Sequence, residues 1–105
     1  MKLTHEILQE AATTFEERNK VYGDNWLRVG EVMMALFPEG ITLRTAEDFQ
    51  RWHLFELIVV KQTRFANSGL THPDSIRDTC VYSAMLESQI NPQTKPIQKN
   101  GGANV

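Results

Sequence analysis

Glu56 is the first residue whose surroundings indicate chemistry. It lies inside the apolar run Leu54–Val60, where a carboxylate is costly to bury unless a cation, a metal ion or hydrogen-bond donors accompany it. His53 precedes it by three residues and Arg64 follows it by eight, so on a helix the three side chains point within about 80° of one another. Either they form a structural network that closes a helical bundle, or Glu56 belongs to a magnesium or phosphate site in the bundle core.

Two further carboxylates, Asp74 and Asp78, are four residues apart and share one face if both lie in one helix. Two or three carboxylates around a small cavity suit Mg²⁺, which takes hard oxygen ligands and keeps waters for a substrate phosphate. We therefore name Glu56, Asp74 and Asp78 as candidate magnesium ligands. Asp74 has an alternative role as the N-cap of the helix that follows it. The D-x-x-x-D spacing alone is common on surface helices.

A basic group, Lys61, Arg64 and His72, lies beside these acids along the chain. Such cations neutralise a polyphosphate while acids hold the metal. The alternative is that cations in the last turn of a helix favour its dipole with no function implied.

Three aromatic side chains with a polar edge, Tyr22, Trp26 and Tyr82, suit contact with a nucleobase. The alternative is that they pack in the core. The residue types therefore allow a nucleotide site without requiring one.

The elements that must position these residues are four helices. Apolar residues recur at helical spacing, and turn residues separate the segments. Thr4, Asp24, Thr45 and Asp74 are the expected N-caps, with Thr45 and Asp48 forming a capping box. The expected helices cover residues 5–20, 25–37, 46–66 and 75–89.

The expected architecture is all-α, an antiparallel four-helix bundle formed by residues 1–90 as a single domain. In the fourth helix the residues expected to turn inward are Ile76, Cys80, Val81, Ala84 and Met85. Residues 91–105 are rich in Pro, Gln, Lys, Asn and Gly, and we expect a disordered tail there. Because the third helix is apolar nearly all round and ninety residues bury a modest core, we also expect a homo-oligomer.

Composition excludes several classes of protein. The 105 residues are 41% hydrophobic with a net charge of −2, so there is no direct evidence for binding duplex nucleic acid. No apolar stretch is long enough to span a membrane. The one cysteine, Cys80, excludes an internal disulfide and a multi-cysteine zinc site, and we expect it to be buried. The first residues lack the apolar segment of a signal peptide, which predicts a cytoplasmic protein, in the host cytoplasm if it is phage-encoded.

Two stretches together resemble a known family. They are Arg18–Trp26, which reads R-N-K-V-Y-G-D-N-W, and K-Q-T-R at Lys61–Arg64 leading to H-P-D-S-I-R-D-T-C-V-Y at His72–Tyr82. They are similar to the phage and prophage nucleotide modification associated domain family, relatives of the MazG-like all-α nucleoside triphosphate pyrophosphatases. The shared patterns are R-x-x-x-Y-G, K-x-x-R and D-S-x-x-D-x-x-x-Y, and the similarity covers roughly residues 5–88.

The resemblance implies an oligomeric helical protein that acts on nucleotides with Mg²⁺ held by acids between helices. By position, Tyr22 forms the turn with Gly23, Lys61 and Arg64 face phosphates, and the two aspartates are metal-binding or structural. The candidate substrate-binding residues are Tyr22, Asn25, Trp26, His72 and Tyr82. MazG-type enzymes carry a later E-x-x-D helix that this sequence lacks, which bears on hydrolysis more than on binding.

Three functional hypotheses follow. In the first, a phage-type pyrophosphohydrolase uses Mg²⁺ on Glu56, Asp74 and Asp78 to activate water against a (deoxy)nucleoside triphosphate, with Lys61, Arg64 and Asp78 as its catalytic residues. In the second, a non-catalytic module binds or sequesters a nucleotide, or assists phage nucleotide or DNA modification. In the third, a small helical interaction protein uses its charges structurally.

Overall fold

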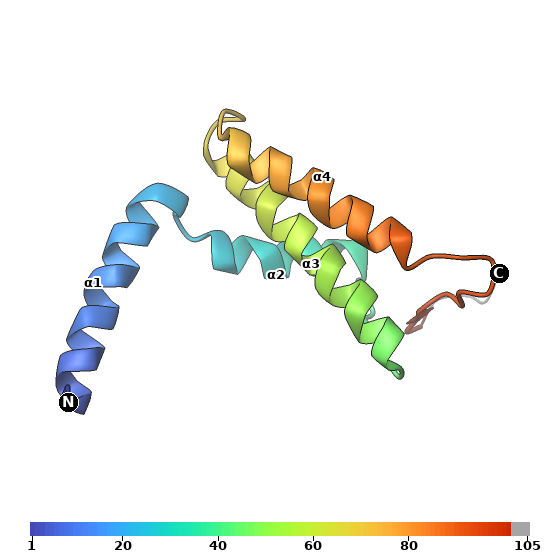
Figure 1. The fold of residues 1–105 in the computed structure, drawn as a ribbon, viewed down its shortest axis with the longest axis horizontal. Coiled ribbons are helices and arrows are strands. Elements are labelled where there is room, and N and C mark those ends of the chain that lie inside the picture. The colour runs from blue at the N-terminus through green and yellow to red at the C-terminus, as the bar shows by residue number, and fades with distance from the viewer. Residues whose placement is uncertain (102–105) are drawn as a thin grey trace.

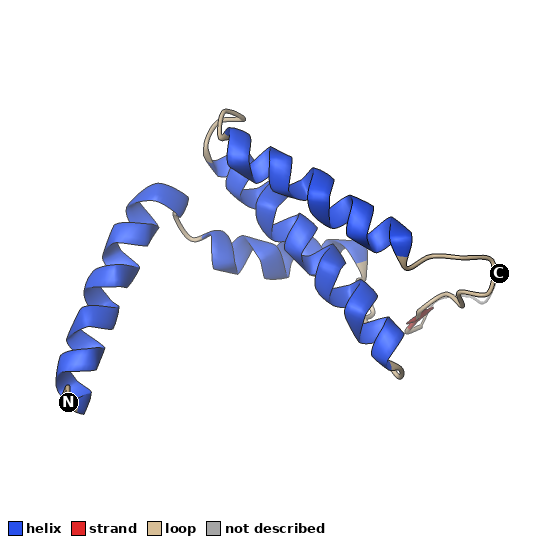
Figure 2. Cartoon of the chain, in the orientation of Figure 1, coloured by secondary structure: helices blue, strands red, loops and turns tan. Residues whose placement is uncertain are grey.

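The computed structural model describes residues 1–101 and is mostly helical (Figures 1 and 2). In order, the elements are α1 (Thr4–Tyr22), α2 (Asn25–Leu36), β1 (Ile41–Thr42), α3 (Ala46–Asn67), α4 (Pro73–Ser88) and β2 (Gln98–Lys99). The expected all-α class is confirmed. Within the described residues, no helix combines the length and the apolar character needed to cross a membrane.

The start of α3 follows the expected capping box. The hydroxyl of Thr45 accepts a hydrogen bond from the backbone N–H of Asp48 at 3.1 Å, and the Asp48 carboxylate accepts one from the N–H of Thr45 at 3.3 Å. The N–H of Arg44 donates to the same carboxylate at 2.9 Å. These bonds satisfy backbone donors that the first turn of a helix leaves free.

Two other helices begin earlier than expected. The N-cap of α4 is His72, because Pro73 fits the first helical position, where its missing N–H costs nothing. Asp74 therefore lies inside the first turn and is not the cap. The N-cap of α1 is Leu3 instead of Thr4, and the Glu6 carboxylate accepts a hydrogen bond from the Leu3 N–H at 3.1 Å.

The core lies along α3, which packs against α2 on one side and α4 on the other (Figure 1). Val59, in the middle of α3, is 1% exposed. Directly after the C-terminal end of α2, Phe37 packs tilted against Trp52 and edge-on against Phe55, with ring centroids 5.6 and 6.2 Å away. The apolar centre that the sequence places in this helix is thus the centre of the folded unit.

The first helix departs from the expected four-helix bundle. α1 extends away from the other three helices (Figure 1), and none of its residues is buried. The chain turns between α1 and α2 at Gly23, whose φ of 60° lies in the region that favours glycine. The packed unit therefore consists of α2, α3 and α4, with α1 attached at its C-terminal end.

The outward side of α4 also differs from expectation. Cys80 is exposed, and so are the apolar residues expected to turn inward with it, including Ile76, Val81 and Met85. The side that meets α3 instead carries Ser75, which is 1% exposed, and Asp78. An ion pair between Lys61 and Asp78 joins the two helices on this side, and the apolar pattern of the α4 sequence does not reveal that contact.

The segment after α4 is structured as far as residue 101, whereas the sequence predicts disorder over residues 91–105. β2 pairs antiparallel with β1, Ile41 opposite Lys99 and Thr42 opposite Gln98. Ile97 lines an apolar hollow of about 260 Å³ together with aromatic residues of the core. The strand at residues 41–42 thus pairs with this polar segment from far along the chain, and the last residues, 102–105, lie outside the described part of the chain.

Candidate functional site

A pocket of about 570 Å³ lies where the end of α1, the start of α2 and the last turns of α3 meet. We call it the arginine pocket. Its polar lining consists of Thr14, Arg18, Asn19, Asn25 and Arg64. Its aromatic and apolar lining includes Phe15, Tyr22, Trp26, Val29 and Val60. The volume is in the range of about 300 to 1,000 Å³ typical of small-molecule sites.

The Tyr22–Gly23 turn that forms one wall is fixed by α3. The side-chain amide of Asn67 donates a hydrogen bond to the Tyr22 carbonyl. A Cβ atom at Gly23 would lie 3.1 Å from Nδ2 of Asn67, and the positive φ there already disfavours other residues. The Y-G pair of the sequence motif thus has a structural task, which is to bring the end of α1 against the end of α3.

Arg64 reaches into the pocket across the ring of Tyr22. Its guanidinium carbon is 4.6 Å from the ring centroid, which is cation–π distance. Its Nε atom is buried and has no hydrogen-bond partner among the described residues. The expected ion pair between Arg64 and Glu56 is not among the ion pairs of the described residues. The side chain therefore presents hydrogen-bond donors and a positive charge that a carboxylate does not neutralise.

Two residues at the start of α2 complete the pocket. Asn25 is 6% exposed, and its Oδ1 atom is buried without a hydrogen-bond partner among the described residues. Trp26 is 63% exposed and lines the same pocket. A buried polar atom without a partner is unusual in a folded protein and calls for an explanation such as a ligand or water.

The electrostatic character of the arginine pocket is positive. Arg18 and Arg64 line it, and its lining contains no aspartate or glutamate. The N-terminus of α2, which carries a partial positive charge, begins at Asn25 in the same wall, with its N-cap residue Asp24 adding a carboxylate just outside the lining. In a chain with a net charge of −2, this is a local environment suited to an anion.

Lys61 and Asp78, expected to contact phosphate and metal, contact each other. Their Nζ and Oδ2 atoms are 2.9 Å apart, joining α3 to α4. Neither residue lines the arginine pocket. The positive charge of Lys61 is thus already paired within the chain.

The remaining sequence candidates lie elsewhere. His72 is placed by a 2.6 Å contact between its Nδ1 atom and the Ser75 hydroxyl, Asp74 is exposed at the start of α4, and Tyr82 is half-buried along it. Glu56 is half-buried on α3. These four residues are not part of the arginine pocket.

The carboxylates do not assemble into a metal site within one chain. Residues 1–101 contain no group of three or more His, Cys, Asp or Glu side chains placed to hold a metal ion. Glu56, Asp74 and Asp78 lie on two helices, and Asp78 is engaged by Lys61. The residues of a single chain therefore do not fit the Mg²⁺ that the resemblance implies.

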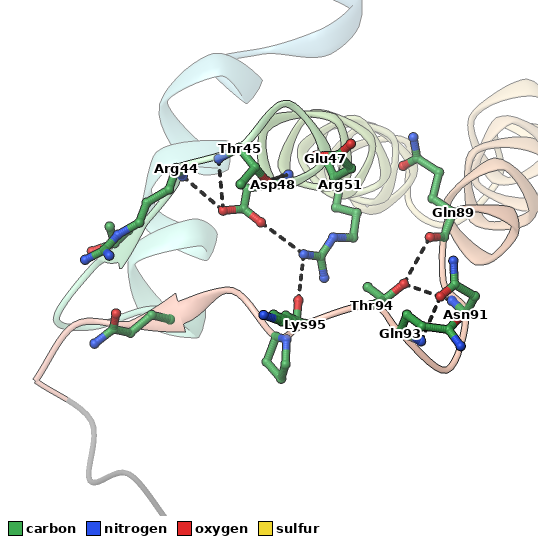
Figure 3. Close-up of a pocket in the computed structure, with 13 residues that line it drawn as sticks. Arg44, Thr45, Glu47, Asp48, Arg51, Gln89, Asn91, Gln93, Thr94 and Lys95 are labelled. Atoms are coloured by element: carbon green, nitrogen blue, oxygen red, sulfur yellow. Dashed lines mark hydrogen bonds and ion pairs between the residues drawn. The ribbon is translucent and has the colours of Figure 1, made fainter.

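A second hollow, of about 460 Å³, lies between the start of α3 and the segment after α4 (Figure 3). Arg51 is central to it, with Nη2 3.1 Å from Oδ1 of Asp48 and 2.8 Å from the carbonyl oxygen of Lys95. The N–H of Arg44 donates to the Asp48 carboxylate and is the main cause that lowers the pKa of Asp48 below its ordinary value of 3.8. Arg51 thus joins Asp48 at the start of α3 to the backbone of the C-terminal segment, although its Nε atom, like that of Arg64, is buried without a partner among the described residues.

Sequence reasoning missed three polar residues of the arginine pocket as site residues, Thr14, Arg18 and Asn19. Arg18 and Asn19 belong to the R-x-x-x-Y-G stretch, and Arg18 lies four residues before Tyr22, hence on the same face of α1. The four-residue spacing between Arg18 and Tyr22 is the sequence feature that could have identified Arg18 as a site residue.

The comparisons with known proteins add no relative. No family model matches the sequence, and no curated protein or solved structure matches it either. The interpretation of the arginine pocket therefore depends on its own residues.

Proposed function

We propose that the arginine pocket binds a nucleotide, with the phosphates at Arg18 and Arg64 and the base against Trp26. The observation that carries this proposal is that two arginines and a helix N-terminus line one pocket that contains no carboxylate. A phosphate is the common biological anion that such a set of donors recognises.

The phosphate contacts follow from arginine chemistry. A guanidinium group presents planar paired donors that match two phosphate oxygens. Stacking on Tyr22 restricts the orientation of Arg64, and its Nε atom is still without a partner. Arg18 is exposed and adds a second positive charge to the lining, from α1.

The base is assigned to Trp26 on the grounds of its exposure. A tryptophan ring that is 63% exposed beside a positive pocket is available to stack on a flat aromatic ligand, and Asn25 beside it supplies an unpartnered amide oxygen that can accept a hydrogen bond. The resemblance of the Arg18–Trp26 stretch to proteins associated with nucleotide modification supports a nucleotide over other phosphate esters.

The proposed activity is nucleotide binding without hydrolysis. Magnesium-dependent pyrophosphohydrolysis needs a carboxylate cluster near the phosphates, and one chain provides none in its described residues. Lys61, proposed from sequence to stabilise phosphate charge, is paired with Asp78. The second sequence hypothesis, a nucleotide-binding or sequestering module, therefore agrees best with the geometry.

Calorimetric titration with ribonucleoside and deoxyribonucleoside triphosphates, in EDTA and again in Mg²⁺, tests the proposal. We expect binding in EDTA, no pyrophosphate release, and a loss of affinity of about tenfold or more in Arg18→Gln. Arg28→Gln is the matched control, because Arg28 is exposed on α2 and does not line the pocket. Equal affinities for the two variants would contradict the pocket assignment, and no binding at all would favour an interaction protein.

A further inference from the structure

Two hollows that are separate from the arginine pocket share the side chain of Arg51. One is the hollow of about 460 Å³ between the start of α3 and the segment after α4, which we call the polar hollow. The other is the hollow of about 260 Å³ beside Ile97, which we call the apolar hollow. No residue of the arginine pocket lines either of them. An apolar space beside a few hydrogen-bonding groups is the usual composition of a ligand site.

The apolar hollow is a part of the core that the chain itself leaves unfilled. Apart from Arg51, every residue that lines it is apolar. The aromatic side chains of the lining, Phe37, Trp52 and Phe55, are only half-buried, and Ile90 is 56% exposed. Protein interiors are close-packed, and an apolar cavity of about 150 Å³ already holds a benzene ring. The apolar hollow therefore has room for an aromatic or branched aliphatic group.

Two buried polar atoms of the polar hollow's residues lack partners among the described residues. Nη2 of Arg51 bonds to Asp48 and to the Lys95 carbonyl oxygen, whereas Nε of Arg51 is buried without an acceptor. Nε2 of Gln89 donates to Oε1 of Gln50 at 3.0 Å, whereas Oε1 of Gln89 is buried without a donor. Arg51 lies on α3 and Gln89 directly after α4, and both line the polar hollow (Figure 3). Buried atoms of this kind cost free energy until a ligand or water satisfies them.

The two missing partners define the chemistry of the ligand. Arg51 lacks an acceptor and Gln89 lacks a donor, so a group with a carbonyl oxygen and an adjacent N–H satisfies both. A carboxylate or a phosphate only accepts hydrogen bonds and would leave Oε1 of Gln89 without a donor. The charge of Arg51 is also already paired with Asp48. A neutral amide therefore fits these residues better than an anion does.

We infer that the two hollows bind an apolar residue of a peptide, with its side chain in the apolar hollow and its backbone amide between Arg51 and Gln89. A peptide is the common biological source of an apolar group joined directly to a neutral amide. Threonine, asparagine and glutamine side chains make up much of the remaining lining of the polar hollow, and they can donate to or accept from further peptide groups. Backbone hydrogen bonds that hold a peptide, beside a pocket that selects a side chain, recur in peptide recognition.

NMR titration of the isotope-labelled full chain with N-acetylphenylalaninamide and N-acetylleucinamide tests the inference. We expect saturable shifts of the Arg51 Nε–H resonance and of the Ile97 amide. Hydrocinnamate, which has a benzyl group and a carboxylate in place of the amide, should cause no saturable shift. Tighter binding of hydrocinnamate or of free phenylalanine would overturn the amide assignment. No saturable shift with either amide, or shifts confined to the arginine pocket, would overturn the site.

A variant of the apolar hollow tests where the side chain of the peptide lies. Ile90→Ser removes apolar surface from the lining and should weaken amide binding by at least about threefold. Ile76→Ser is the matched control, because Ile76 is 47% exposed on α4 and lines neither hollow. Equal affinities of the two variants would overturn the inference. The titration of the unmodified chain does not depend on either variant folding, and saturation with a nucleoside triphosphate should leave amide binding unchanged.

Discussion

Lys61 of α3 and Asp78 of α4 form an ion pair, with 2.9 Å between Nζ and Oδ2. The two residues come from the K-x-x-R and D-S-x-x-D motifs, which the sequence assigns to phosphate and metal. Because the two residues contact each other, the structure gives them a structural role, which is to join α4 to α3. Arg64, three residues after Lys61, points instead to Tyr22 and the arginine pocket.

A structural role for this pair predicts a small effect of Asp78→Asn. The Lys61 and Asp78 side chains are 17% and 41% exposed, so the loss in unfolding free energy should stay below about 1 kcal/mol. Nucleotide affinity should be unchanged. Urea unfolding and calorimetric titration of the same variant check both statements. Native stability with abolished nucleotide binding would instead support the functional role expected from sequence.

The capping box of α3 predicts a larger loss. Thr45→Ala removes the acceptor for the Asp48 N–H and should cost about 1 kcal/mol, which lowers Tm by about 4 to 8 °C for a domain of this size. Thr13→Ala, on the exposed surface of α1, is the control and should not lower Tm. Thermal unfolding followed by circular dichroism measures the two shifts. Equal shifts in Tm for the two variants would contradict the role of the Thr45 cap in stabilising α3.

The carboxylate of Asp48 predicts a pH dependence of stability. Its pKa is lowered from 3.8 mainly by the hydrogen bond from the Arg44 N–H, so folding favours the ionised form. The resulting stabilisation is fully present above the unfolded pKa and is lost as the pH falls through the lower folded value. Wild type should therefore exceed Asp48→Asn in unfolding free energy at about pH 7, and the gap should close toward about pH 2. A gap that stays constant over this range would contradict the assignment.

The C-terminal segment should contribute to stability through Ile97. This side chain lines the apolar hollow beside Phe37 and Trp52 and is half-buried, so Ile97→Ala should cost about 1 kcal/mol. Gln98→Ala is the neighbouring control, because its side chain is exposed while its backbone pairs with Thr42. Denaturant unfolding compares the variants. An unaffected Ile97→Ala would show that the segment does not support the core.

Local signals in the sequence predicted the elements well. Thr45 with Asp48 marked the start of α3, and the apolar run around Val59 marked its buried centre. Both depend on neighbours in the chain, which a sequence displays directly. The order of the segment after α4 could not be predicted, because it depends on Ile41 and Thr42 pairing with Lys99 and Gln98 from far along the chain.

Candidate residues from one short stretch of sequence lie together in the structure. Tyr22, Asn25 and Trp26 follow one another closely and line one pocket with Arg64. The grouping of Glu56 with Asp74 and Asp78 failed within one chain because it needed the rotation of α4 about its axis. In the structure Asp78 instead contacts Lys61 of α3, a tertiary contact that the sequence does not display.

The most direct measurement is the affinity of Trp26→Ala for a nucleoside triphosphate and for inorganic triphosphate, both titrated calorimetrically in EDTA. If Trp26 stacks on the base while arginines hold the phosphates, the variant should lose about 5- to 150-fold in nucleotide affinity. Its affinity for inorganic triphosphate should match that of wild type. Wild-type affinity for the nucleotide would contradict the proposal, since the base would then not stack on Trp26.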